Sequence, residues 1–191
     1  MADIPEGRIF DWEIRCYSVS AEEVAVTNRR LEEIGWPFRQ EAGCYLGLFN
    51  ANRFIMGTSP VELWTLIEPM KNAQGHVLLA GLGLGILARA LAEQDKVTSI
   101  TVVELSQEVI SMVEPYTRHR KIKVVQGDIF KYSPAMHFDY AWIDIWNRIT
   151  PSNLSEMNIL EGKLQPYCSS IGFLAKSECV KNINKSIGGD N

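Results

Sequence analysis

The sequence predicts an α/β fold: a doubly wound, mostly parallel sheet that follows an N-terminal β-hairpin and helix. Three observations lead to this prediction. Short, β-branched and almost continuously apolar segments recur after residue 76, as in strands that are buried on both faces. Segments with helical periodicity separate them, as the crossover connections of a parallel sheet require. A glycine-rich segment, GLGLG at 81–85, follows the first apolar run and allows close approach to its backbone.

The first 72 residues are expected to form an appendage to this sheet. A β-rich segment over Arg8–Val19 comes first, and a helix follows it from a capping box at Ser20 and Glu23 to about Ile34. Next comes a hairpin of Tyr45–Phe49 and Arg53–Met56. A second helix then runs from a capping box at Ser59 and Glu62 to about Met70. The second helix directly precedes the first core strand, so Ser59 and Glu62 could also touch a substrate. Capping accounts for both residues without that contact.

Residues 73–180 are expected to form the α/β core of a single domain over 1–191, with a loose polar tail over 181–191. The predicted strands are Val77–Ala80, Ser99–Glu104, Ile122–Gln126 and Phe138–Asp144. The predicted helices are Gly85–Gln94, Ser106–His119 and Pro151–Leu164, the last capped by Thr150. The apolar segment Ile171–Ala175 fits no single element clearly.

The three glycines of the loop, Gly81, Gly83 and Gly85, lie where ligands bind in open parallel sheets, beyond the carboxyl ends of the strands. Glycine permits a positive φ and lets a ligand lie against bare backbone. The alternative is that these glycines only allow the helix to pack closely on the strand. The loop by itself does not decide between the two.

Acidic residues follow the next three predicted strands at the same edge of the sheet. Glu104 lies just over twenty residues beyond Gly81, where a carboxylate can accept both hydroxyls of a ribose, so a nucleoside ligand is indicated. Asp128 can accept a hydrogen bond from an adenine amine, and Asp144 and Trp146 follow the fourth strand. Three acids around one crevice also favour a cationic ligand.

A dinucleotide remains an alternative at this point. Residues 83–88, GLGILA, fit the GxGxxA form of the dinucleotide-binding loop, which leaves a nicotinamide or flavin enzyme open.

The ordered motifs GLGLG, VVEL, QGDI and FDYAWID resemble the four ligand motifs of class I S-adenosylmethionine-dependent methyltransferases. The spermidine-synthase-like branch is the most similar, because its members also carry an N-terminal β-hairpin; the resemblance covers about residues 45–146. It implies S-adenosylmethionine as cofactor. By the resemblance, Gly81, Leu82, Gly83 and Gly85 line its methionine and ribose, Glu104 holds the ribose diol, Leu105 packs on adenine, Asp128 and Ile129 bind the adenine amine edge, and Asp144 faces the sulfonium as the catalytic residue. Apart from the resemblance, Trp146 is an aromatic beyond the end of its strand and is a candidate for stacking on adenine or acceptor.

Two departures from the family pattern limit the resemblance. Spermidine synthases carry a second acid and a proline soon after the fourth-strand aspartate, whereas residues 144–148 read DIWNR, which disfavours polyamine synthesis. A full methyltransferase sheet has seven strands, but only about 45 residues follow Trp146. Either the sheet is reduced, or the N-terminal segment or another subunit closes the site, so a homo-oligomer is possible.

The composition of the chain limits the kinds of partner that we expect it to bind. The net charge of −4 argues against nucleic-acid binding by bulk electrostatics. The four cysteines form no CxxC pair and only three histidines are present, so no metal site is expected. The sequence has no long apolar span and no signal peptide pattern, and we expect a cytoplasmic protein without a membrane partner.

The sequence therefore predicts an S-adenosylmethionine-dependent transferase that methylates a small-molecule acceptor. Spermidine-synthase-like aminopropyl transfer is one alternative. A protein that binds the nucleoside without catalysis is the other.

Overall fold

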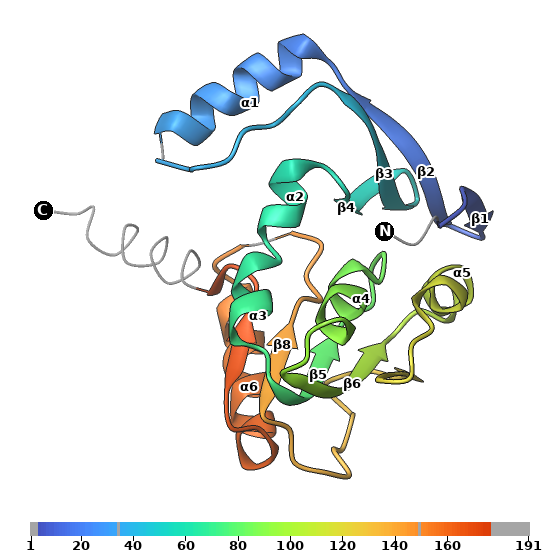
Figure 1. Cartoon of the computed structure of the whole chain (residues 1–191), viewed down its shortest axis with the longest axis vertical. Coiled ribbons are helices and arrows are strands. Elements are labelled where there is room, and N and C mark those ends of the chain that lie inside the picture. The colour runs from blue at the N-terminus through green and yellow to red at the C-terminus, as the bar shows by residue number, and fades with distance from the viewer. Residues whose placement is uncertain (1–3, 34, 149, 177–191) are drawn as a thin grey trace, which may run out of the picture.

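The computed structural model describes residues 4–33, 35–148 and 150–176, and it contains two sheets (Figure 1). An antiparallel sheet with the strand order β1-β2-β3-β4 lies at the N-terminal end of the chain. A parallel sheet with the order β7-β6-β5-β8-β9 follows it. The predicted α/β fold with a parallel sheet and an N-terminal appendage is thus confirmed. The tail predicted over 181–191 lies outside the described residues.

The N-terminal sheet is larger than the predicted hairpin. Its strands are β1 (Gly7–Ile9), β2 (Trp12–Val19), β3 (Gly43–Asn50) and β4 (Arg53–Gly57), with helix α1 (Ala21–Glu33) between β2 and β3. The capping box of α1 is confirmed, because Ser20 N donates to Glu23 Oε2 at 2.7 Å and Glu23 N donates to Ser20 Oγ at 3.2 Å. The β3–β4 turn places Ala51 and Asn52 at φ 47° and 63°, as a tight hairpin turn requires.

The second predicted capping box is wrong. Two short helices, α2 (Pro60–Trp64) and α3 (Ile67–Asn72), replace the single helix expected to reach Met70, and the Ser59 side chain makes no capping hydrogen bond. Pro69 explains the break, because it has no N–H to donate to the carbonyl four residues earlier and its ring crowds that carbonyl. Thr65 instead closes α2 by donating its N–H and its hydroxyl to the Glu62 carbonyl.

The parallel sheet has five strands in the described residues. Its elements are β5 (Gly75–Ala80), α4 (Ile86–Ala92), β6 (Val97–Glu104), α5 (Gln107–Thr117), β7 (Ile122–Gln126), β8 (Tyr140–Ile143), α6 (Asn153–Leu164), the 3₁₀ turn η1 (Gln165–Tyr167) and β9 (Ile171–Phe173). The four predicted strands are confirmed, and the unassigned apolar segment supplies the fifth. Helix α6 begins two residues later than predicted, with Ser152 rather than Thr150 as its N-cap residue.

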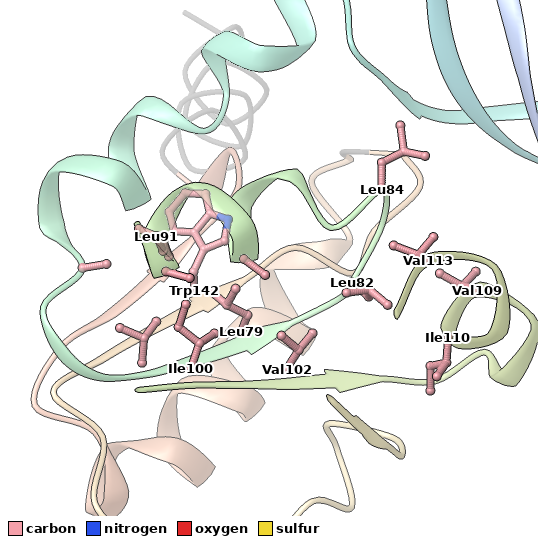
Figure 2. Close-up of a cluster of buried hydrophobic side chains, with 14 of the residues drawn as sticks. Leu79, Leu82, Leu84, Leu91, Ile100, Val102, Val109, Ile110, Val113 and Trp142 are labelled. Atoms are coloured by element: carbon pink, nitrogen blue, oxygen red, sulfur yellow. The ribbon is translucent and has the colours of Figure 1, made fainter. Parts of the chain in front are cut away.

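Alternate residues of the parallel strands face two apolar layers. Leu79 and Trp142 point to the layer under α4 and α5 (Figure 2), whereas Leu78 and Ile143 point to the layer under α6. Trp142 is 2% exposed and is the largest side chain among the buried residues of this layer.

The N-terminal sheet packs on the α4–α5 side of the parallel sheet. Ile14 of β2 and Leu48 of β3 are each 1% exposed and belong to the same apolar cluster as Leu84 and Val113. Met56 of β4 packs against this cluster. The appendage therefore shares its core with the α4–α5 layer, beside the loop that follows β5.

None of the helices described between residues 4 and 176 has the length and apolar character needed to span a bilayer.

Helix α6 offers a direct test of the second apolar layer. Leu160 is 0% exposed, so Leu160→Ala should lower the free energy of unfolding by about 2–5 kcal/mol through lost burial and a cavity. The neighbouring Ile159 is 62% exposed, and Ile159→Ala should change stability by only about 0.5 kcal/mol. Urea unfolding of both variants checks this expectation. Equal losses for the two would contradict the placement of α6.

Candidate functional site

The candidate site lies at the carboxyl edge of the parallel sheet, between β5 and β8. The chain runs from β5 to β6 and β7 on one side and reaches β8 and β9 on the other, so the strand order reverses at this point. The glycine loop follows β5 and Asp144 follows β8. The two segments are joined by a hydrogen bond of 3.1 Å from Asp144 N to Ala80 O. This is the position, beyond the carboxyl ends of the strands at the reversal of strand order, where open α/β sheets bind ligands.

All three loop glycines are required by the backbone of the protein itself. Gly81, Gly83 and Gly85 have φ values of 97°, 52° and 69°, in the left-handed region that favours glycine. A Cβ at Gly81 would meet the Asp144 carbonyl oxygen, and a Cβ at Gly85 would meet the Thr117 side chain. At these two positions, close packing of the loop is therefore sufficient to explain glycine.

Gly83 differs from the other two because its bare face touches the N-terminal sheet. A Cβ at this position would meet the Sδ of Met56, which lies on β4. The same sulfur accepts a hydrogen bond of 3.3 Å from Leu84 N. The appendage thus reaches the middle of the glycine loop.

Glu104 ties the glycine loop to the start of α5. Its Oε2 accepts a hydrogen bond of 2.8 Å from Leu82 N, and its Oε1 accepts one of 2.8 Å from Ser106 N. Ser106 in turn caps α5, since its hydroxyl accepts from Val109 N at 3.2 Å. Each carboxylate oxygen has a further lone pair, so Glu104 can still accept a hydroxyl of a ribose.

The residues expected around adenine are divided between surface and core. Leu105 is 70% exposed and free to pack against a flat ring. The Asp128 carboxylate accepts a hydrogen bond of 2.9 Å from Phe130 N. The side chain of Ile129 is 4% exposed and packs in the layer under α6, so only its backbone can meet a ligand. The same holds for Leu82, whose side chain is 6% exposed.

Asp144 experiences the charge of a second acid, Glu62, which comes from the appendage. Burial, and then the negative charge of Glu62, raise the pKa of Asp144 to about 6. Burial also raises the pKa of Glu62 in α2, while a hydrogen bond from the Gly57 N–H lowers it in part. Neither carboxylate takes part in an ion pair among the described residues. The pair thus creates a negative field in the crevice, which would attract a cation.

Trp146 is held on the α6 side of this edge. Its Nε1 donates to Glu156 Oε2 at 2.6 Å, and its ring lies 6.3 Å from that of Phe173. The predicted stacking of Trp146 on a ligand stays a prediction.

Met56 and Glu62 contribute to the site in ways that the local sequence pattern does not predict. Met56 occupies an ordinary apolar position of a hairpin, and nothing in its local pattern distinguishes it. Glu62 was expected to cap a helix. The proline at Pro69 was the available signal against one long helix. Among the described residues, no group of three or more His, Cys, Asp or Glu side chains is placed to hold a metal ion.

No family model matches the chain, and no curated protein matches it. Similar solved structures include a complex of DhpI with S-adenosylhomocysteine, at TM-score 0.48 and 18% identity over 58% of this chain and 54% of DhpI. The N-methyltransferase NodS from Bradyrhizobium japonicum, also with S-adenosylhomocysteine, matches at TM-score 0.47 and 18% identity over 57% of each chain. The plantazolicin methyltransferase BpumL matches at TM-score 0.40 and 22% identity over 56% of this chain and 40% of its own.

The chain thus spans between 40% and 57% of the length of these three proteins. We base the function on the geometry of the site itself.

The two hydrogen bonds of Glu104 predict a role in stability. Glu104→Ala leaves the N–H groups of Leu82 and Ser106 without their carboxylate, and we expect a loss of about 1–3 kcal/mol in the free energy of unfolding. Glu93→Ala, on the surface of α4, should change stability by only about 0.5 kcal/mol. Chemical unfolding of the two variants is the measurement. A Glu104→Ala protein as stable as wild type would mean that the loop does not depend on this carboxylate.

The acid pair predicts a pH dependence of stability. Because the pKa of Asp144 rises from 3.8 in the unfolded chain to about 6 in the folded one, the folded protein binds more protons between these values. The contribution of this group to the free energy of unfolding is fully present below about pH 4 and is lost as the pH rises through 6. Asp144→Asn removes the effect, so the variant should gain up to about 3 kcal/mol relative to wild type between pH 4 and pH 7.

The control for this pH series is Glu62→Gln. It removes the charge that helps to raise the pKa of Asp144, so the loss of stability with rising pH should become smaller. Parallel profiles for wild type and Asp144→Asn would show that Asp144 is not the responsible group.

Proposed function

We propose that this protein binds S-adenosylmethionine in the crevice between β5 and β8 and transfers its methyl group to a small-molecule acceptor. The observation that carries the proposal is the set of partners of the glycine loop. Leu82 N donates to Glu104, Leu84 N donates to Met56, and Gly85 N donates to the carbonyl of Leu82. Leu82 N and Gly85 N are thus engaged by a carboxylate and a backbone carbonyl, whereas Leu84 N has only a weak thioether acceptor.

This arrangement disfavours a dinucleotide. A dinucleotide-binding loop offers its N–H groups and the following helix N-terminus to a pyrophosphate. Here a phosphate would lie next to the Glu104 carboxylate and would have to displace it from the N–H of Leu82. S-adenosylmethionine has no phosphate, and its positive sulfonium suits a crevice that contains Glu62 and Asp144.

The residues of the crevice divide into a nucleoside side and an acceptor side. On the nucleoside side, Glu104 would accept the ribose hydroxyls, Leu105 would cover the adenine ring, and Asp128 with the backbone of Ile129 would meet its amine edge. On the acceptor side, Asp144 would face the sulfonium.

The bound sulfonium supplies an activated methyl group, so the protein needs to align the acceptor and exclude water. With a pKa of about 6, Asp144 is mostly ionised at pH 7 and can accept a hydrogen bond or a proton from the acceptor. Glu62 stands beside it and reinforces the negative potential.

Glu62 also supports aminopropyl transfer as a second candidate function. The segment after Asp144 lacks the second acid of the spermidine synthases, and on the sequence alone this difference disfavours polyamine synthesis. In the folded chain, Glu62 of α2 brings a second carboxylate to Asp144 from another part of the sequence. An acceptor with amino groups would find two carboxylates there.

Ligand binding should appear as thermal stabilisation. S-adenosylmethionine or S-adenosylhomocysteine at a hundredfold excess over its Kd should add about 2.7 kcal/mol, a rise in Tm of roughly 5–10 °C for a chain of this size. NAD should give no shift. Differential scanning fluorimetry with the three compounds measures this. A rise with NAD alone would overturn the proposal.

The reaction itself requires labelled cofactors and metabolite extracts. Transfer of a labelled methyl group supports the main proposal. Transfer of the aminopropyl group from decarboxylated S-adenosylmethionine supports the second candidate. Binding without either transfer would leave a protein that binds the nucleoside only.

A further inference from the structure

The thioether of Met56 lies on the glycine loop, on the face that a ligand would need. Gly83 has a positive φ and no Cβ, so its backbone is bare on the side where Met56 Sδ lies. The sulfur also accepts the N–H of the next residue, Leu84, at 3.3 Å. The contact joins β4 to a loop that follows it by more than twenty residues in the sequence.

This contact is suited to being broken. A thioether sulfur is a weak hydrogen-bond acceptor, and methionine has three rotatable side-chain bonds that allow it to leave without moving the backbone. The Met56 side chain is half-buried rather than enclosed, and β4 is the edge strand of its sheet.

The backbone next to Met56 is fixed more firmly than its side chain. Thr58 N donates to Leu46 O at 2.9 Å, and Leu46 N donates to the Thr58 hydroxyl at 3.0 Å. A rearrangement at this point would therefore involve side-chain rotation of Met56, while the strand itself stays in place.

We propose that Met56 is a gate at the cofactor site: its side chain covers Gly83 and Leu84 in the ligand-free protein and moves off the loop when the nucleoside binds. The inference rests on the proposed function, because it assumes that the ligand lies against the glycine loop. The inference goes beyond that function because it gives the N-terminal sheet a part in setting the affinity of the site. The free protein must give up the Met56 contact before binding, so the apparent Kd equals the Kd of the open form divided by the fraction of open molecules.

The test is the affinity of Met56→Ala for S-adenosylhomocysteine, measured by titration calorimetry beside wild type. Without the covering side chain, the variant should bind about 3- to 10-fold more tightly. This factor corresponds to one weak hydrogen bond, which wild type has to break before binding and the variant does not. Met70→Ala is the matched control. Its thioether accepts from Gln94 Nε2 at 3.5 Å on another face of the fold, and its loss should leave the Kd unchanged.

A second measurement uses the wild-type protein and does not depend on a variant that folds. With ¹³C-labelled methionine methyl groups, the free protein should show a nuclear Overhauser effect between the Met56 methyl and the amide of Leu84. Addition of S-adenosylhomocysteine should abolish it. The methyl of Met157, a residue of α6 that is 0% exposed, should remain unchanged.

The outcomes separate the gate from the proposed function. If wild type binds and Met56→Ala binds equally or more weakly, or if the Overhauser effect persists in the complex, Met56 is a fixed wall of the site and the gate is overturned while the function stands. If neither wild type nor Met56→Ala binds the nucleoside, the proposed function fails and the gate fails with it. Tighter binding by Met56→Ala supports both.

Discussion

The arrangement of the site depends on the carboxylate of Glu104. It stands at the end of β6 and accepts one N–H from the glycine loop and one from the start of α5. These three segments come from different parts of the chain, and the glycine loop adopts positive φ at Gly81, Gly83 and Gly85. A single ionised group that accepts two backbone N–H groups fixes their relative positions more strongly than neutral contacts would. The crevice therefore has its shape before any ligand enters.

The N-terminal sheet forms part of the site rather than a separate attachment. Ile14 and Leu48 share one apolar cluster with Leu84 and Val113, and this burial holds β4 against the glycine loop. Packing of this kind is non-directional and carries no chemistry of its own. The packing of these apolar side chains nevertheless has a specific result, because it places the thioether of Met56 on the glycine loop. An α/β core without this sheet would have the glycine loop but not its cover.

The parts of the fold that the sequence predicted are those governed by local rules. β8 is found because a central parallel strand is a continuous apolar run, and all four of its residues are buried. The capping box at Ser20 is confirmed because both partners lie within four residues. Local rules failed where a distant segment decides. Glu62 satisfies the capping pattern, yet packing of α2 turns it toward Asp144. The strand β9 has three residues, too few to show a period. The contact of Met56 with Leu84 joins residues whose approach depends on the packing of the two sheets.

The two half-buried carboxylates are unfavourable in the free protein, because burial opposes the ionisation of both and the charge of Glu62 also opposes that of Asp144. A protein without use for them would gain stability by replacing either one. Their cost is offset when a cation enters the crevice, since each carboxylate then ionises at a lower pH and attracts the ligand as it does so. The sulfonium of the proposed cofactor and a basic acceptor both meet this condition. The appendage supplies Glu62 and the parallel sheet supplies Asp144, so the negative potential exists only where the two parts meet. Under the proposed function, the N-terminal sheet would therefore supply the five-stranded sheet with a charge, from Glu62, and a side chain on the glycine loop, from Met56.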